Sequence, residues 1–90
     1  MKALRLAKMV ERISERLNDA HYFLSPGATY YTGGSEHNCD CLTAVVDDDG
    51  TVNVSDHQGS SEDWDSAEYA TSKDVKRAVQ EWLGNLWDQP

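Results

Sequence analysis

Basic residues are missing from most of this chain. Lys and Arg occur only in the first and last segments, so residues 18–72 contain none, while the same stretch holds eleven acidic residues. Eleven acids against no bases give it a formal charge of −11, in a chain whose net charge is −8. The phosphate backbone of a nucleic acid would repel such a stretch. The composition therefore argues against direct nucleic-acid binding.

Cysteines and long apolar runs are also scarce. The two cysteines, Cys39 and Cys41, are one residue apart, and a disulfide between them would close a very short, strained ring. We therefore expect reduced thiols, as in the cytosol. No apolar run approaches the roughly 18 to 20 residues that span a bilayer, and the N-terminus lacks a signal-like apolar block. We expect a cytosolic protein with no membrane partner, in the host cytoplasm if the chain is phage-encoded.

Ninety residues predict a single domain, residues 1–90, with one modest core. Three Trp, four Tyr and clear periodic segments argue against disorder. Two segments have helical periodicity, residues 3–19, ending at Asn18 and Asp19, and residues 72–87. Thr71 followed three residues later by Asp74 is typical of a helix N-terminus. Gly84 costs the second helix about 1 kcal/mol relative to alanine, which suggests close packing or fraying.

The stretch from residue 41 to residue 57 predicts a β-hairpin. Two runs rich in β-branched residues flank Asp47-Asp48-Asp49-Gly50, and glycine accepts a positive φ in a turn. A three-residue loop, residues 48–50, sets Val46 opposite Val52 and Ala44 opposite Val54, with Leu42 on the same core face. A two-residue turn would mix the apolar and polar faces. We therefore expect the three-residue loop.

The remaining segments are assigned by their composition. Residues 28–32 predict a first strand, because Thr29, Tyr30 and Tyr31 are β-formers in a row. Residues 58–66 have no period and predict a loop, and residues 67–70 could form a short fourth strand. The expected fold is therefore α+β, in the order helix, strand, strand, strand, helix. An antiparallel meander of three strands, or of four if residues 67–70 join it, would carry both helices on one face.

This order resembles the topology of the double-stranded RNA-binding domain. Members of that family place a lysine-rich start of the last helix on phosphates, whereas this chain has only Lys73, Lys76 and Arg77 there, close to Asp74. The sheet and loops carry the opposite charge. The resemblance is one of fold and does not extend to RNA binding.

One cluster of residues offers the chemistry of a zinc site. On a strand, His37, Cys39 and Cys41 would leave the same face, and the expected register sets His57 opposite Cys41. Thiolate and imidazole are zinc ligands, but the C-x-C spacing differs from the C-x2-C to C-x4-C spacing of zinc knuckles. The alternative is that these four residues bind no metal and that the protein needs no cofactor.

Calcium binding and catalysis have less support. An EF-hand reading of the triple-aspartate loop would put Val45 at the first ligand position and Asp56 at the twelfth, where a glutamate belongs. No nucleophile elbow, phosphate-binding glycine loop or metal-hydrolase helix motif occurs. The acidic surroundings of Cys41 and His57 also disfavour a reactive thiolate. We expect a protein that is not an enzyme.

The acidic stretch, residues 18–72, predicts what kind of partner the protein binds. A carboxylate array can occupy a groove built for phosphates, because Arg and Lys donors accept either anion. We therefore expect an inhibitor of a basic nuclease or nucleic-acid-binding complex. In size and charge it is similar to anti-CRISPR, anti-restriction and nuclease-immunity proteins. Trp64 would either cap the core or anchor the contact. The expected contact residues are Asp47, Asp48, Asp49, Asp56, Glu62, Asp63, Trp64 and Asp65.

Two alternatives remain open at this point. One is a small zinc-stabilised module that uses the histidines and cysteines. The other is a homo-oligomer, for example a homodimer. It would form through an exposed edge strand or by docking of the basic first helix on the acidic face of another copy.

Overall fold

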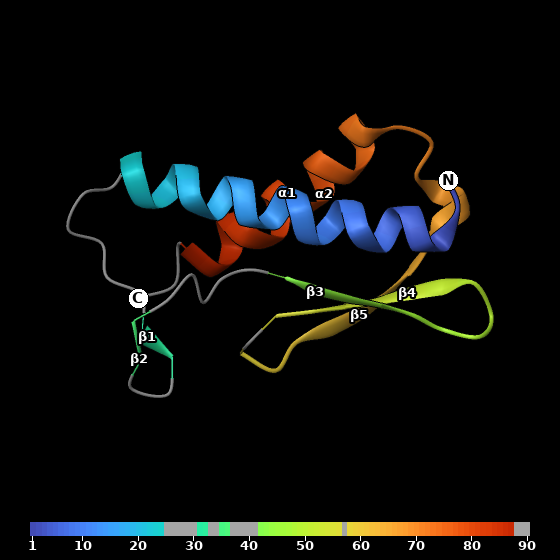
Figure 1. Ribbon diagram of the computed structural model, residues 1–90, viewed down its shortest axis with the longest axis horizontal. Coiled ribbons are helices and arrows are strands. Elements are labelled where there is room, and N and C mark those ends of the chain that lie inside the picture. Colours follow the sequence, from blue (N-terminus) through green and yellow to red (C-terminus); the bar gives the residue numbers. More distant parts are fainter. Residues whose placement is uncertain (25–30, 33–34, 37–41, 57, 88–90) are drawn as a thin grey trace.

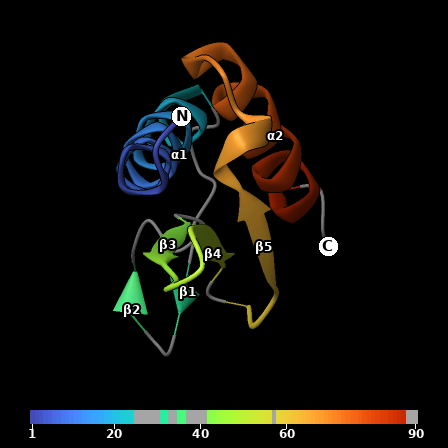
Figure 2. The same ribbon diagram turned by 90° about the vertical axis from the view of Figure 1, so that its right-hand side faces the viewer.

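The computed structural model describes residues 1–24, 31–32, 35–36, 42–56 and 58–87. Two helices lie over one face of a three-stranded antiparallel sheet (Figures 1 and 2). This confirms the α+β architecture expected from the sequence. The elements in chain order are α1 (Ala3–Leu24), β1 (Tyr31–Thr32), β2 (Ser35–Glu36), β3 (Thr43–Val46), β4 (Thr51–Ser55), β5 (Ser61–Asp65), the 3-10 helix η1 (Ser66–Glu68) and α2 (Ser72–Trp87).

The β3–β4 hairpin has the expected register. Val46 pairs with Val52 and Ala44 with Val54. The Asp47 N–H donates to the Thr51 carbonyl over 2.9 Å, which closes a three-residue loop. Gly50 occupies the left-handed region at φ 86°, where a side chain would be strained. The loop chemistry of the sequence therefore determines both the turn and the face of the hairpin that enters the core.

The third strand of the sheet lies where the sequence predicted a loop. Residues 61–65 form β5, which pairs with β4 and sets Trp64 opposite Val52. This stretch has no β-branched residue, but β4 offers an unpaired edge and Trp64 supplies a large apolar group on the core face. The possible fourth strand over residues 67–70 is wrong. Asp65 instead accepts the Ala67 N–H over 2.9 Å, which favours the 3-10 turn η1.

Two further boundaries differ from the sequence-based expectation. Helix α1 continues to Leu24 and does not end at Asp19, because Asn and Asp cost a helix only tenths of a kcal/mol and the first strong breaker is Pro26. The strand expected over residues 28–32 is represented by β1, which pairs with β2 in a separate two-stranded ribbon. Residues 28–30 lie outside the described part of the chain. The main sheet therefore consists of β3, β4 and β5.

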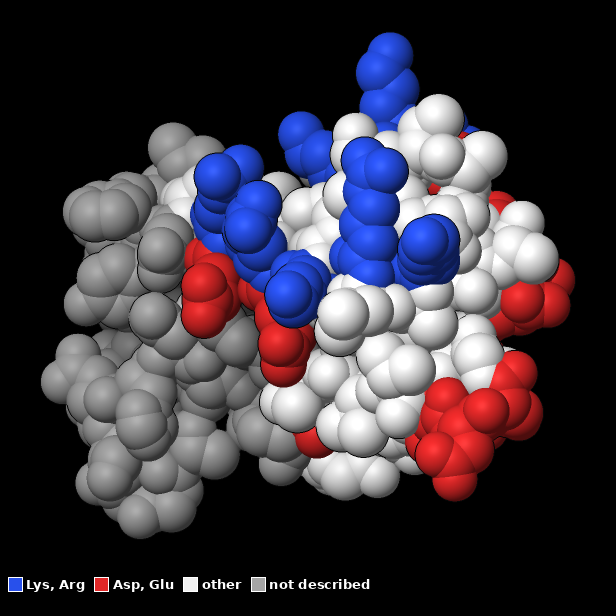
Figure 3. All heavy atoms as spheres, turned by 45° about the vertical axis from the view of Figure 1, so that its right-hand side comes forward, with Lys and Arg blue, Asp and Glu red and all other residues white. Residues whose placement is uncertain are grey.

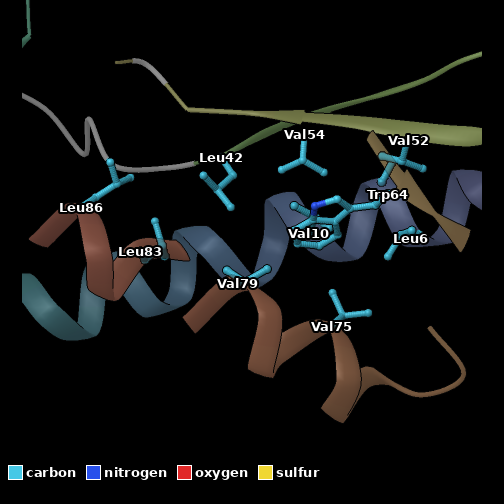
Figure 4. Packing of buried hydrophobic residues seen from close by; sticks show 11 residues of the cluster. Leu6, Val10, Leu42, Val52, Val54, Trp64, Val75, Val79, Leu83 and Leu86 are labelled. Carbon is cyan, nitrogen blue, oxygen red and sulfur yellow. The ribbon is translucent and has the colours of Figure 1, made fainter. Parts of the chain in front are cut away.

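The core lies between the sheet and the two helices (Figure 4). Each fully buried Val or Leu side chain stabilises the fold by roughly 1.5–3 kcal/mol relative to an exposed one. The amphipathic stripes predicted for both helices face this core. Its buried apolar side chains are Leu6, Ala7 and Val10 of α1, Leu42 just before β3, Val52 and Val54 of β4, Trp64 of β5, and Val75, Val79, Leu83 and Leu86 of α2.

Polar groups of α1 take up the outer edge of β3. The Ser14 hydroxyl is buried, accepts the Leu42 N–H over 3.1 Å and donates to the Glu11 carbonyl over 2.9 Å. The Glu11 carboxylate accepts the Ala44 N–H over 3.3 Å. These N–H groups are therefore satisfied by the helix and cannot pair with a strand of another molecule.

Candidate functional site

Charge is divided between the two layers of the molecule. The four Lys and Arg side chains of α1 and that of Lys2, which directly precedes it, are all exposed. Figure 3 shows Lys and Arg grouped on the upper part of one face, with a few acidic side chains directly below them, and a larger group of acidic side chains at its lower right. The molecule therefore has a basic side and an acidic side, although its net charge is strongly negative. These basic residues are Lys2, just before α1, and Arg5, Lys8, Arg12 and Arg16 of α1.

The acidic tip, which we define as Asp47, Asp48, Asp49 and Asp65, lies at the loop end of the β3–β4 hairpin. All four side chains are exposed. Asp65 belongs to this group because it pairs with Thr51, the first residue after the loop. The Ser66 hydroxyl donates to the Gly50 carbonyl over 3.3 Å and so holds the end of β5 against the loop. Four carboxylates therefore gather at one end of the sheet.

Thr51 orders the carboxylates of this loop. Its hydroxyl donates to Asp49 over 2.7 Å, and its backbone N–H donates to the same oxygen over 3.1 Å. These two hydrogen bonds favour the ionised form and lower the pKa of Asp49 below its ordinary value. Asp49 therefore remains a carboxylate at neutral pH. Its other oxygen stays available to a donor from a partner.

The acidic surface continues along β5 on the face of the sheet that points away from the helices. Asp63 lies two residues before Asp65 on this face, about 7 Å away by the rise of a strand. The Asn53 side chain donates to Asp63 over 3.1 Å and orients it. Val45, on the same face, is 57% exposed. The face is thus mainly polar, with acids along one edge.

Two of the expected contact residues, Asp56 and Trp64, are buried and hold the fold together. The Asp56 side chain is 8% exposed and accepts hydrogen bonds from the Gln58 and Ser60 N–H groups and from the Trp82 indole. Its carboxylate closes the β4–β5 turn and is not available to a partner. Trp64 is 6% exposed and packs in the core, because it faces the helices from β5. An exposed Trp64 anchor is therefore wrong.

The residues of the possible zinc site, His37, Cys39, Cys41 and His57, lie outside the described residues. The zinc module therefore stays a prediction, which metal analysis of protein purified without chelator would test. Within the described ranges, no three His, Cys, Asp or Glu side chains are placed to hold a metal ion together.

An open groove between β5 and α2 was missed by sequence reasoning. Its volume is about 480 Å³, and we call it the aromatic groove. Trp82 was assigned to the apolar stripe of a helix, and Tyr69 to a possible strand. The signal in the sequence was the position of aromatic residues next to acidic ones. Only the packing of α2 on β5 brings these aromatic residues together. Its main lining residues are Glu62, Trp64, Tyr69, Ala78, Glu81 and Trp82.

A second groove follows the outer face of α1, and we call it the basic groove. Its volume is also about 480 Å³, and Leu4 in it is 58% exposed. In the part of the chain that the structure describes, no helix is both long enough and apolar enough to cross a membrane. The groove combines the exposed apolar side chain of Leu4 with the positive charge of its Lys and Arg residues. Its lining residues are Lys2, Leu4, Arg5, Lys8, Met9 and Arg12.

Comparison of the chain with protein-family models, with curated proteins and with solved structures finds no match. The functional argument therefore depends on the geometry and charge of the surfaces described above.

Proposed function

We propose that the protein is a cytosolic, non-enzymatic binding protein that inhibits a basic, nucleic-acid-handling partner. The acidic tip and Asp63 would occupy the partner's phosphate-binding surface. The observation that carries this proposal is the gathering of five exposed carboxylates on one end and one face of a small sheet. Anti-CRISPR, anti-restriction and nuclease-immunity proteins are the classes of inhibitor that this proposal covers.

The chemistry of the proposed contact is that of charge-assisted hydrogen bonds. Arg and Lys side chains that bind phosphate oxygens also bind carboxylate oxygens, with bidentate geometry in the case of Arg. The carboxylates lie on a paired β-hairpin and its neighbouring strand, so little backbone conformational entropy is lost on binding. Long-range attraction would also raise the association rate at low salt. Binding should therefore weaken as the salt concentration rises.

The test compares two variants of the tagged protein. In the tip variant, Asp47→Asn, Asp48→Asn and Asp49→Asn remove three negative charges, and the net charge changes from −8 to −5. Asparagine tolerates turn geometry, so the hairpin should fold. The control variant carries Glu15→Gln, Ala20→Lys and Gln80→Lys at exposed helix positions, and its net charge is also −5.

Each protein is used to capture partners from a lysate of the source organism, followed by a salt gradient and mass spectrometry. We expect the wild type and the control to retain a nuclease or nucleic-acid-binding complex that added DNA displaces. The tip variant should lose it while keeping its thermal melting temperature. Equal capture by the tip variant would contradict the proposal.

A second candidate function is self-association, which the basic groove favours. Leu4 and the cations of α1 form a surface whose charge is complementary to the acidic tip. Docking of the groove on the tip of another copy would bury both. The two surfaces lie on different parts of the molecule, so such a contact would be heterologous and could continue from copy to copy.

A further inference from the structure

The aromatic groove has rigid walls. The rings of Trp64 and Tyr69 stack with their centroids 5.1 Å apart and their planes 15° apart. The Trp82 ring is tilted by 47° relative to that of Trp64, and the two ring centroids are 6.1 Å apart. The Trp82 indole N–H donates to the Asp56 carboxylate over 2.9 Å, which fixes the orientation of the ring. The aromatic surfaces are therefore in place before any ligand binds.

The mouth of this groove carries negative charge from two different elements. Glu62 projects from β5 and Glu81 from α2, and both side chains are exposed. Among the described residues that line the groove, none is Lys or Arg. Burial raises the pKa of Tyr69, and the nearby charges of Glu68 and Glu62 raise it further. The Tyr69 ring therefore lies in a negative potential.

Aromatic faces and carboxylates together suit one class of ligand, an organic cation. A cation over an aromatic face gains about 0.5–1 kcal/mol at an exposed site and more where water is excluded. A volume of about 480 Å³ falls within the range of pockets that hold small ligands or single side chains. The groove thus differs in chemistry from the acidic tip, which offers carboxylates alone.

We infer that the aromatic groove receives the side chain of an arginine from a basic segment of the partner. This inference rests on the proposed function, because it takes the partner to be a basic protein. A guanidinium group is planar and weakly hydrated, so it stacks on Tyr69 and Trp82 while its N–H groups reach the carboxylates of Glu62 and Glu81. Lysine has the charge but lacks the planar, forked geometry. The groove would therefore select arginine over lysine.

The test uses three blocked pentapeptides as probes, Gly-Gly-X-Gly-Gly, in which X is arginine, lysine or the neutral analogue citrulline. Each is titrated into isotopically labelled protein, and amide and indole N–H signals are followed by NMR. We expect the arginine peptide to shift the indole signal of Trp82 and the backbone signals of Glu62 and Glu81. The lysine peptide should bind at least threefold more weakly, which corresponds to about 0.7 kcal/mol or more, and the citrulline peptide should cause no shift.

Matched variants separate the groove from general electrostatic attraction. Glu62→Gln with Glu81→Gln should weaken arginine-peptide binding at least fivefold. Glu15→Gln with Ala20→Lys changes the net charge by the same two units at exposed positions outside both the groove and the acidic tip, and it should leave binding within twofold of the wild type. All four substitutions are at exposed positions, and thermal melts of both variants should match the wild type. Equal weakening in both variants, or no shift of the Trp82 signal, would overturn the inference.

Failure of this inference can be distinguished from failure of the proposed function. The tip variant should still bind the arginine peptide at the groove, because Asp47, Asp48 and Asp49 do not line it. Loss of the groove shifts in the tip variant would contradict a separate arginine site. The partner capture experiment depends on the tip carboxylates and uses no peptide. The capture experiment and the peptide titration can therefore fail independently of each other.

Discussion

The Asp56 carboxylate joins the β4–β5 turn to helix α2. One oxygen accepts the Gln58 and Ser60 N–H groups over 2.9 and 3.1 Å, and the other accepts the Trp82 indole over 2.9 Å. Asp56→Ala would remove the acceptor for all three donors, which are partly buried. We expect a loss of about 2–4 kcal/mol in the free energy of unfolding, measured by urea denaturation.

The control for this substitution is Asp48→Ala, which removes an exposed acid from the same hairpin. A surface change of this kind should alter the free energy of unfolding by no more than about 0.5 kcal/mol. Equal effects of the two substitutions would contradict the structural role of Asp56. Comparison of the two variants also distinguishes an acid that stabilises the fold from an exposed acid that is available to a partner.

At the scale of elements, the N-terminus of α2 gives a pH-dependent contribution to stability. Thr71 donates its backbone N–H and its hydroxyl to the Asp74 carboxylate, each over 3.1 Å. The backbone bond and then the hydroxyl bond lower the pKa of Asp74 from its ordinary value of 3.8. A lowered folded-state pKa stabilises the fold above the unfolded-state value, and this stabilisation is lost as the pH falls through the folded-state value.

Asp74→Asn should therefore destabilise the protein at neutral pH, because it removes this carboxylate. The difference in melting temperature between wild type and variant should stay constant down to about pH 4 and shrink below pH 3.8. Thermal melts followed by circular dichroism across this range would show it. A difference that is unchanged at pH 2.5–3, roughly one unit below the ordinary value, would contradict the capping role.

Gly84 in α2 neither packs closely nor occupies a special backbone region. Among the residues that the structure describes, a Cβ atom added there would meet nothing within 4 Å outside the local helix backbone. Close packing, which the sequence suggested as one reason for this glycine, is therefore wrong. Gly84→Ala should stabilise the protein by about 0.5–1 kcal/mol and raise the melting temperature by roughly 2–8 °C.

Gly50 provides the matched contrast for that substitution. It lies in the left-handed region at φ 86°, so Gly50→Ala should destabilise the protein by roughly 1–2 kcal/mol although its surroundings are also open. Opposite shifts in melting temperature are expected for the two alanine variants. Shifts of the same sign would contradict the backbone argument.

Sequence-based prediction succeeded for elements whose structure is determined by their own residues. In the β3–β4 hairpin, only the three-residue loop sets Val46 opposite Val52 and Ala44 opposite Val54, so the register followed from the pattern of apolar residues. In β5 the residues are polar apart from Trp64, and the strand forms because β4 offers it a partner edge. The aromatic groove depends in the same way on contacts between β5 and α2. Neither feature can be read from the composition of one segment, because each depends on which other element packs beside that segment.

At the scale of the whole molecule, separation of charge has consequences that net charge alone does not predict. The acids of the sheet were expected from the sequence, but which of them are exposed depends on the fold, which buries Asp56 and exposes Asp63. The basic groove on α1 and the acidic tip lie on one molecule. At low salt, where screening is weak, copies of such a molecule can attract each other despite a net charge of −8.

Self-association can be tested by light scattering at about 20 mM and about 500 mM salt, where the Debye length differs several-fold. If copies dock groove to tip, the mass should rise with concentration at low salt and return to 10.1 kDa at high salt. Because the contact is heterologous, the mass should continue to rise without stopping at a dimer. A constant mass at both salt concentrations would exclude this second candidate.

Two variants then identify the surfaces. The tip variant lacks the acids, and a helix variant with Arg5→Gln, Lys8→Gln and Arg12→Gln lacks cations of the basic groove. Each should be monomeric alone, because one half of the contact is missing. In a mixture, the intact groove of the first meets the intact tip of the second, and the chain of contacts ends there. We therefore expect the mass measured for the mixture to reach about twice 10.1 kDa and no more. A mass that continued to rise, or that did not change on mixing, would show that copies do not bind through these two surfaces.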